Sequence, residues 1–183
     1  NINLNMKILY QGSPGAYSHL AALEVNPKAE IVSCKTFDEC FFRAEEDQDI
    51  KIIIPESNRI TGNIGIEYLI FKHRLNIYAE HFHQIEHNLL GVPGSKVNDI
   101  KNVFSHQQAL SQCSSFIKKN KIIENVRADT AGSAELISIN KDKTEAAIAS
   151  KLSAQIYGLD ILAKNIENEK GNATRFLIMG KPI

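Results

Sequence analysis

Short apolar runs alternate with stretches of helical periodicity along almost the whole chain, and this alternation limits the fold more than any other feature of the sequence. The run 50–54 is apolar on both faces, which is typical of a central parallel strand, and Pro55 is expected to end it. Strands that alternate with helices are typical of the α/β class, so an α/β fold is predicted. The expected strands are 6–10, 31–34, 50–54, 103–104, 122–126, 146–149, 159–166 and 173–179.

Helix signals fill the segments between these runs. Thr36 with Glu39, and Ser105 with Gln108, fit capping boxes, in which two side chains satisfy unpaired backbone amides reciprocally. Gly158 is expected to end a helix in the left-handed conformation that glycine favours. Helices are expected after the glycine turn 12–15, after both boxes, and at 64–72, 130–139 and 150–157. The apolar stripe expected after the second box is Leu110, Cys113, Phe116 and Ile117. The segment 75–90 is rich in β-formers and could cross between two lobes.

Charge and composition exclude several classes of protein. The 183 residues include 21 Lys and Arg and 21 Asp and Glu, and this zero net charge argues against a nucleic-acid-binding protein. No apolar run approaches the roughly 18 residues of a membrane span, so no membrane partner is expected. An odd number of well-separated cysteines makes a disulfide framework or a cysteine zinc site unexpected. Each of the three cysteines is expected to be buried and to act as a small hydrophobic residue: Cys34, Cys40 and Cys113.

The first five residues have no signal-peptide pattern. They are expected to be non-native or flexible, with the natural start at Met6, and the protein is expected to be cytoplasmic.

Two loops could bind anions or polar ligands. The turn 12–15 joins a strand to a helix, so its amides lie at the positive end of the helix dipole and suit a carboxylate or phosphate. A simple tight turn is the alternative, and the turn fits neither a dinucleotide nor a P-loop fingerprint. In the loop 55–63, Ser57, Asn58 and Thr61 could hydrogen-bond a ligand and Arg59 could pair with a carboxylate. A solvated loop is the alternative there.

Two further segments carry polar side chains of interest. Ser105 is expected to be a helix N-cap, Gln112 lies one turn beyond Gln108 on the same helical face, and His106 could exchange a proton near neutral pH. A capped structural helix is the alternative. In the strand around 172–177, Thr174 and Phe176 should face one side and Arg175 the other.

Three histidines of equal parity would share one face of an extended strand: His81, His83 and His87. Histidines two residues apart can ligate zinc, but a solvent-facing histidine stripe is the simpler interpretation, and no metal is expected.

Taken in order, these segments resemble the catalytic domain of the prephenate dehydratase family, which includes the arogenate dehydratases. The resemblance covers Lys7 to Pro182. The turn 12–18 resembles the family's Gly-x-Pro-Gly-(Ala/Thr)-(Tyr/Phe)-Ser motif, and 105–113 resembles its Ser-His-Pro-Gln-Ala-Leu-x-Gln-Cys segment. The segments 129–134, 145–150, 157–159 and 172–176 are similar to further family motifs in the same order.

The resemblance implies two α/β lobes, like type II periplasmic binding proteins, with the active site in the cleft between them. The first lobe would contain 6–80 with 167–181, and the second 81–166. The family usually continues into a regulatory ACT domain that binds phenylalanine, and no ACT domain is expected in this sequence.

The implied reaction is the loss of water and CO₂ from prephenate to give phenylpyruvate, without a cofactor or metal, in a homodimer. Action on arogenate and a non-catalytic anion-binding module are the alternatives. The implied catalytic residues are Thr174, Ser105, Gln112 and Asn58, with Thr174 as a hydrogen-bond donor to the leaving hydroxyl. The implied substrate-binding residues are Arg175, Phe176, Gly15, Ala16, Tyr17, Ser57, Arg59 and His106.

One family motif fits in two registers. The family's Pro-Ile-Glu-Asn-Ser loop aligns with 55–59, which sets Ser57 at the family glutamate and Arg59 at its Ser/Thr. A shift of one residue would instead align Glu56 with that glutamate. The roles of Ser57 and Glu56 therefore stay open, and Asn58 is the safer assignment.

Overall fold

The chain forms two compact units, each with its own β-sheet, in a computed structural model that describes residues 6–183. The segment 1–5, expected to be non-native or flexible, lies outside the described residues. Unit 1 contains 6–13, 17–85 and 172–183, and unit 2 contains 14–16 and 86–171. The chain passes between the units after residues 85 and 171, later than the expected 80 and 166. The reason is that the strand entering this crossing stays paired in the unit 1 sheet as far as Gln84.

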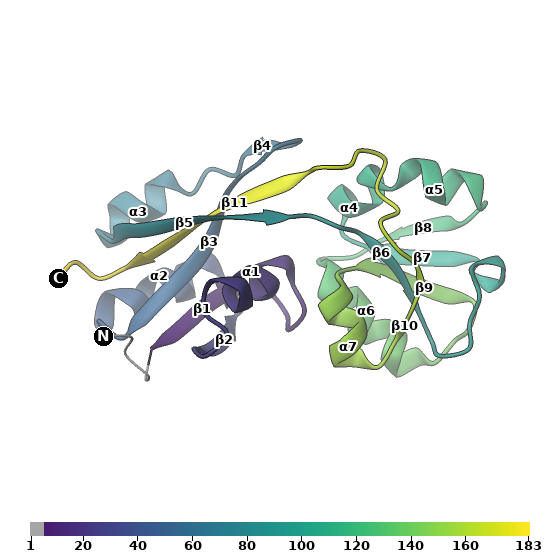
Figure 1. Cartoon of the computed structure of the whole chain (residues 1–183), viewed down its shortest axis with the longest axis horizontal. Helices are drawn as coiled ribbons and strands as arrows, with labels where there is room; N and C mark the ends of the chain where they lie inside the picture. Colours follow the sequence, from purple (N-terminus) through teal and green to yellow (C-terminus); the bar gives the residue numbers. More distant parts are fainter. Residues whose placement is uncertain (1–5) are drawn as a thin grey trace. The chain divides into compact units, whose positions relative to one another are not determined.

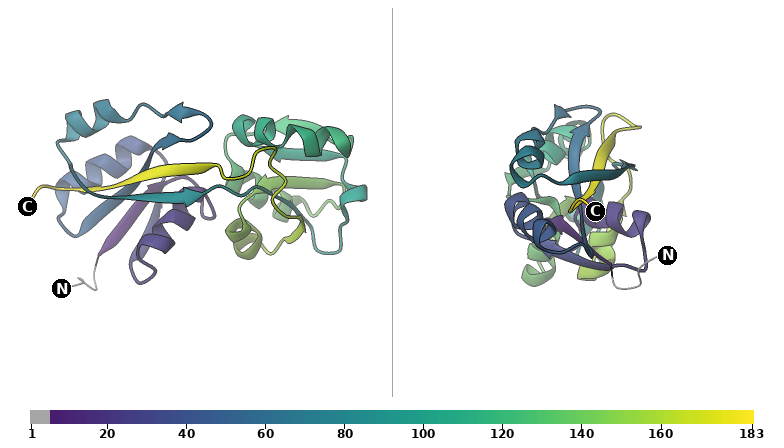
Figure 2. Two further views of the ribbon diagram at one scale, coloured as in Figure 1. Left: turned by 45° about the horizontal axis from the view of Figure 1, so that its top comes forward. Right: turned by 90° about the vertical axis from the view of Figure 1, so that its left-hand side faces the viewer.

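Unit 1 is built on a six-stranded mixed sheet with the order β2-β1-β3-β11-β5, and β4 pairs with β3 (Figure 1). Strands β1 and β2 are parallel, as are β1 and β3, whereas β11 is antiparallel to both β3 and β5. Figures 1 and 2 show β5 and β11 side by side along their whole length. The strands are β1 Lys7–Gln11, β2 Glu30–Cys34, β3 Ile50–Asn58, β4 Gly62–Asn63, β5 Asn76–Gln84 and β11 Ala173–Gly180. The helices are α1 Tyr17–Val25, α2 Phe37–Glu46 and α3 Glu67–His73.

Strand β3 continues through Pro55 to Asn58, so the expected end at Pro55 is wrong. The register of β3 against β11 shifts between Arg175 and Phe176, and Phe176 pairs with Pro55 at this irregularity. A bulge is one of the few places where a sheet tolerates proline, because the ladder there does not require the missing N–H. The expectation of a central strand is confirmed, but β3 is parallel only to β1.

Half of the first expected capping box forms at α2, with Thr36 as the N-cap. Thr36 Oγ1 accepts a hydrogen bond from the Glu39 amide at 3.1 Å. The Glu39 carboxylate accepts from the amide of Lys35, at 3.0 Å, one residue before the position that the box predicts. The helix then buries its apolar face against the sheet through Cys40, Phe41 and Ala44.

Unit 2 is built on a five-stranded sheet with the order β10-β6-β9-β7-β8. In the core of this sheet, Ala146, Ala147 and Ala149 of β9 are fully buried, because small side chains allow close packing at its centre. The strands are β6 Asn88–Gly91, β7 Asn102–Ser105, β8 Ile123–Val126, β9 Glu145–Ala149 and β10 Asp160–Ala163. The helices are α4 Gln107–Gln112, α5 Ser114–Lys119, α6 Thr130–Asn140 and α7 Lys151–Tyr157, with a 3₁₀ turn at Val97–Asp99.

Two helix predictions in unit 2 have different outcomes. Gly158, at φ 65°, ends α7 in the left-handed conformation, as expected. The expected helix after residue 105 is divided at Cys113, whose backbone leaves the helical region, into α4 and α5. Its stripe is nevertheless buried at Leu110, Cys113 and Ile117. The three cysteines are buried, as predicted.

The observed elements confirm the α/β class. Among the helices of residues 6–183, none combines the length and the apolar character required to cross a bilayer.

Candidate active site

Asn58 and Thr174, both predicted catalytic residues, lie opposite each other on β3 and β11 of unit 1. Asn58 Nδ2 donates a hydrogen bond to Thr174 Oγ1 at 2.9 Å. Asn58 Oδ1 accepts from the amides of Ile60 and Thr61, at 3.0 and 3.2 Å, so the amide group is held in one orientation. The Thr174 hydroxyl therefore acts as acceptor towards Asn58 and keeps its hydrogen for another partner.

Arg175 lies on the other face of β11 and is held between two carboxylates of its own sheet. Its Nε donates to Glu80 Oε2 at 2.6 Å, and its Nη1 to Glu56 Oε2 at 3.1 Å. These hydrogen bonds, the one to Glu80 first, raise the pKa of Arg175. Ser57 Oγ also donates to Glu56, at 2.6 Å. Glu56, Ser57, Glu80 and Arg175 thus form one polar cluster. Within it, the Glu56 carboxylate accepts hydrogen bonds from both Ser57 and Arg175.

Three other predicted residues of unit 1 have different surroundings. Phe176 is only 1% exposed and packs in the interior. Tyr17, the first residue of α1, has its ring 6.1 Å from that of His83. Arg59 is exposed at the end of β3, and its backbone amide donates to the Ala173 carbonyl at 2.9 Å.

The glycine turn is anchored within unit 2 by the start of α7. Ser150 Oγ and Ser153 Oγ donate to the Gly15 carbonyl at 2.6 and 3.1 Å, and Tyr157 Oη donates to the Pro14 carbonyl at 2.6 Å. Gly15 has φ +97°, and a Cβ there would lie 2.4 Å from Ser153 Oγ. Only glycine fits this position, next to Ala16, which is also a predicted binding residue.

Ser105 is not the N-cap of α4, so that prediction is wrong. It is still part of β7, paired with Val126, and its fully buried hydroxyl donates to the Ile148 carbonyl at 2.7 Å. The N-cap is His106, whose Nδ1 accepts from the Gln108 amide at 3.1 Å. Strand β7 extends one residue further than expected, to Ser105, and the N-cap of α4 is therefore the next residue, His106.

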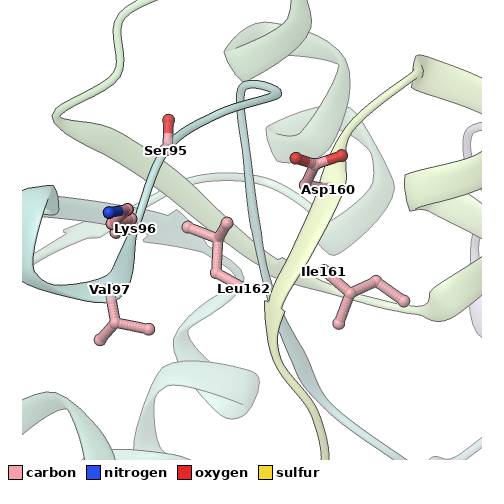
Figure 3. A pocket seen from close by; sticks show the side chains of 6 residues that line it. All are labelled: Ser95, Lys96, Val97, Asp160, Ile161 and Leu162. Atoms are coloured by element: carbon pink, nitrogen blue, oxygen red, sulfur yellow. The ribbon is translucent and has the colours of Figure 1, made fainter.

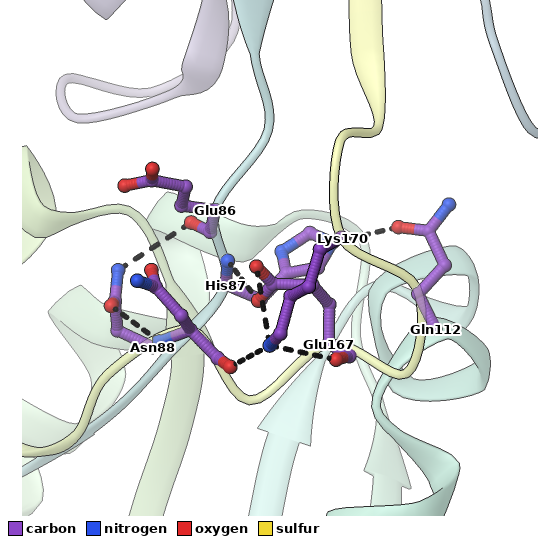
Figure 4. Close-up of polar contacts among 7 residues, drawn as sticks. Glu86, His87, Asn88, Gln112, Glu167 and Lys170 are labelled. Atoms are coloured by element: carbon purple, nitrogen blue, oxygen red, sulfur yellow. Dashed lines mark hydrogen bonds and ion pairs between the residues drawn. The ribbon is translucent and has the colours of Figure 1, made fainter.

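Gln112 ends α4 and contacts His87, one of the three histidines of equal parity (Figure 4). His87 Nε2 lies 2.7 Å from Gln112 Oε1. The His87 ring is buried, which lowers its pKa, while the hydrogen bond to Gln112 and the charge of Glu167 act in the opposite direction. Glu167 is buried as well, accepts from the His87 amide at 3.1 Å, and lies 3.7 Å from Lys170 Nζ.

The three histidines do not form a solvent-facing stripe. His83 and His87 are buried, and His87 belongs to unit 2. His81 and His83 of β5 both contact the Glu24 carboxylate of α1, with His81 Nε2 at 3.7 Å. Across residues 6–183, no group of three or more His, Cys, Asp or Glu side chains has the arrangement of a metal site.

A cavity of about 430 Å³ in unit 2 lies beside β10, and Figure 3 shows its lining. None of the predicted site residues lines it. The lining residues are Ser95, Lys96, Val97, Asp160, Ile161 and Leu162.

Sequence reasoning missed the partners that hold the predicted residues in place. The acidic ones come from distant segments, and no local pattern connects them with the residues they contact. The serines of α7 had a weak signal, since Ser150 begins an expected helix. The missed residues are Glu24, Glu80, His87, Ser150, Ser153 and Glu167, whereas Glu56 was already an open assignment.

Comparison with known proteins identifies the family. The sequence model named "Prephenate dehydratase" matches residues 8–183. The chain is 43% identical over 177 residues to arogenate dehydratase/prephenate dehydratase 1 of Arabidopsis thaliana, a match that covers 96% of this chain and 45% of that protein. The chain therefore spans about half the length of such curated relatives.

Comparison with solved structures supports the same family. The quorum quenching acylase GqqA superposes with a TM-score of 0.90 at 34% identity, over 97% of this chain and 64% of that one. Prephenate dehydratase from Arthrobacter aurescens superposes with a TM-score of 0.88 at 22% identity, over 97% and 61%, which establishes the shared fold. This fold is two-lobed, α/β and like that of periplasmic binding proteins. With a family match over nearly its whole length and the fold of a family structure, the chain belongs to the prephenate dehydratase family.

Proposed function

We propose that this chain catalyses the decarboxylating dehydration of prephenate to phenylpyruvate, a step in phenylalanine biosynthesis. The observation that supports this most directly is the hydrogen bond from Asn58 Nδ2 to Thr174 Oγ1, at 2.9 Å. It joins two residues that the family resemblance assigns to catalysis and that are 116 positions apart in the sequence. It also leaves the Thr174 hydrogen available to a third group, as a donor to a leaving hydroxyl requires.

The reaction breaks two bonds of the substrate ring. The C–C bond to the ring carboxylate breaks and releases CO₂, and its electron pair moves into the ring. The C–O bond at the opposite carbon breaks, and the departing hydroxide takes a proton from solvent to leave as water. Aromatisation supplies the driving force, and no electrons are gained or lost overall.

Thr174 assists this departure as a positioned donor rather than as an acid, because a neutral threonine is a weak Brønsted acid. A preorganised donor aimed at developing negative charge typically contributes a factor of about 10²–10³ to the rate. Asn58 contributes by holding the Thr174 oxygen, so that the hydroxyl hydrogen does not turn towards the protein.

The substrate carries two carboxylates, which need donors in the protein. We assign this task to Gln112, to the amides around Gly15 and Ala16, and to Arg59. Arg175 supports the site indirectly under this proposal, because Glu80 and Glu56 already offset its charge. The position of the active site between the lobes remains a prediction.

The test is to incubate the protein with prephenate at neutral pH and to measure phenylpyruvate by chromatography. Arogenate is assayed in parallel, with phenylalanine as the product. Phenylpyruvate formation supports the proposal, whereas turnover of arogenate alone selects the arogenate dehydratase alternative. The name of the Arabidopsis relative includes both activities, which is why both substrates belong in the assay. Binding without product from either substrate selects the non-catalytic module.

The same proposal includes a homodimer in the cytoplasm, on the basis of the family resemblance for the dimer and of the sequence for the location. Light scattering after size-exclusion chromatography measures the mass directly. A mass equal to one chain of 20.4 kDa at assay concentrations contradicts the dimer.

A further inference from the structure

We propose that His87 is a positioning residue for Gln112: its imidazole Nε2–H donates to Gln112 Oε1 and so presents the Gln112 amide nitrogen as a donor to the substrate. The inference rests on the proposed function only for the substrate role of Gln112. The orientation of the Gln112 amide is a property of unit 2 by itself.

The contact is short and buried. His87 Nε2 and Gln112 Oε1 are 2.7 Å apart, and His87 is only 3% exposed. Figure 4 shows the Gln112 carbonyl oxygen directed at the ring and its amide nitrogen directed away. Since a carbonyl oxygen can only accept, the ring nitrogen that it contacts must carry the hydrogen.

Both partners are tied to one short segment, residues 166–168. The Ile166 amide donates to the His87 carbonyl at 2.9 Å, and the Glu167 carboxylate accepts from the His87 amide at 3.1 Å. The Asn168 amide donates to the Gln112 carbonyl at 2.7 Å. The backbones of His87 and Gln112 are therefore held relative to each other, which leaves the side-chain contact little freedom.

The chemistry of the side chains explains why this orientation matters. A glutamine amide presents either two donors or a carbonyl oxygen, according to how it is turned. An oxygen turned towards a doubly anionic substrate would repel it, whereas an NH₂ group binds its oxygens. Because His87 takes the oxygen, the group left for a ligand is the donor.

The first test compares two replacements of His87. Glutamine places its amide nitrogen at about the reach of Nε2, whereas asparagine stops near the position of Nδ1. H87N is expected to lower kcat/KM for the active substrate about tenfold, which corresponds to one misdirected hydrogen bond. H87Q is expected to stay within about threefold of the unmodified protein. Equal losses in both variants overturn the proposal.

A double-mutant cycle separates positioning from a general structural role. If His87 acts through Gln112, H87N has little further effect once Q112A has removed the amide, so H87N/Q112A should match Q112A within about twofold. If the loss of kcat/KM in H87N/Q112A instead equals the product of the losses in H87N and Q112A, the proposal is overturned. H73N is the matched control: His73 is a buried histidine of unit 1 whose ring centroid lies 5.6 Å from that of Phe41, and loss of the ring should lower the melting temperature while kcat/KM stays unchanged.

Nuclear magnetic resonance tests the contact without activity. In the unmodified protein labelled with ¹⁵N-histidine, His87 is expected as the Nε2–H tautomer at neutral pH. The Gln112 side-chain amide signals should shift in H87N and not in H73N. A His87 ring without hydrogen on Nε2 overturns the inference even when the protein is active. Absence of turnover with both substrates instead overturns the proposed function, and the spectra still decide whether His87 orients Gln112.

Discussion

At the scale of single residues, the direction of one hydrogen bond determines what Thr174 can do. Asn58 has its amide oxygen engaged by two backbone amides, so only its nitrogen can meet Thr174. The threonine oxygen accepts that bond, and the hydroxyl hydrogen is left for another partner, which under the proposed function is the leaving hydroxyl of the substrate. Alternation along the strand predicted the faces of Thr174 and Arg175, because side chains of a strand alternate with a period of two. The carboxylates on either side of Arg175 come from other strands, and their approach could not be predicted from a local pattern.

Replacement of Thr174 tests the donor role. T174V keeps the shape of the side chain but removes the hydroxyl, and it is expected to lower kcat by about 10²–10³. T174S keeps the hydroxyl and should retain activity within about tenfold. In T174V the Asn58 nitrogen loses its partner, so the free energy of unfolding should fall by about 1–3 kcal/mol. Steady-state kinetics and urea denaturation measure both quantities. A near-normal kcat in T174V would contradict the role.

The buried His87 makes stability depend on pH. Burial lowers the pKa of His87 in the folded state below its ordinary value of about 6.5. The unfolded chain therefore binds more protons as the pH falls below about 6.5, and the folded state loses stability. The free energy of unfolding should decrease between about pH 7.5 and 5, and less steeply in H87Q. His19, whose pKa is also lowered by burial, acts in both proteins and cancels in the comparison. If the free energy of unfolding depends on pH in the same way in the unmodified protein and in H87Q, the prediction is contradicted.

At the scale of secondary-structure elements, the order of strands and helices was predictable, whereas their ends depended on tertiary contacts. The strand β3 passes through Pro55 because β11 offers an irregular register there. The helix α4 starts after His106 because β7 extends to Ser105 to pair with β8. In both cases a neighbouring strand overrides a local signal, and the position of such a neighbour is not contained in the local sequence. Gly158, whose role depends only on its own helix, was predicted correctly.

The turn at Gly15 offers an element-scale prediction with a matched control. In G15A the left-handed backbone is strained, and the new methyl group would lie 2.4 Å from Ser153 Oγ. In G158A the backbone is similarly left-handed, at φ +65°, but nothing lies within 4 Å of the added carbon. G158A should cost about 1 kcal/mol of stability and G15A about 2–3 kcal/mol. Thermal or urea denaturation compares the two variants, and equal losses would show that Ser153 yields without cost.

At the scale of the whole molecule, balanced charge predicts how the proposed substrate is attracted. With 21 basic and 21 acidic residues, the protein offers the doubly anionic substrate of the proposed function no favourable long-range field. Salt screens long-range attraction between protein and substrate, and here there is little such attraction to screen. The value of kcat/KM should therefore change by less than about threefold between 0.05 and 0.3 M salt. Initial rates at low substrate concentration measure this. A decrease of tenfold or more would indicate a strong local positive potential instead.

The anchored glycine turn has a consequence for recombination between related genes. Residues 14–16 belong to unit 2, although the chain on both sides of them belongs to unit 1. A chimaera that exchanges only residues 86–171 would therefore combine the turn of one parent with Ser150, Ser153 and Tyr157 of the other. The module that can be exchanged intact is discontinuous in the gene, and its smaller part is a tripeptide.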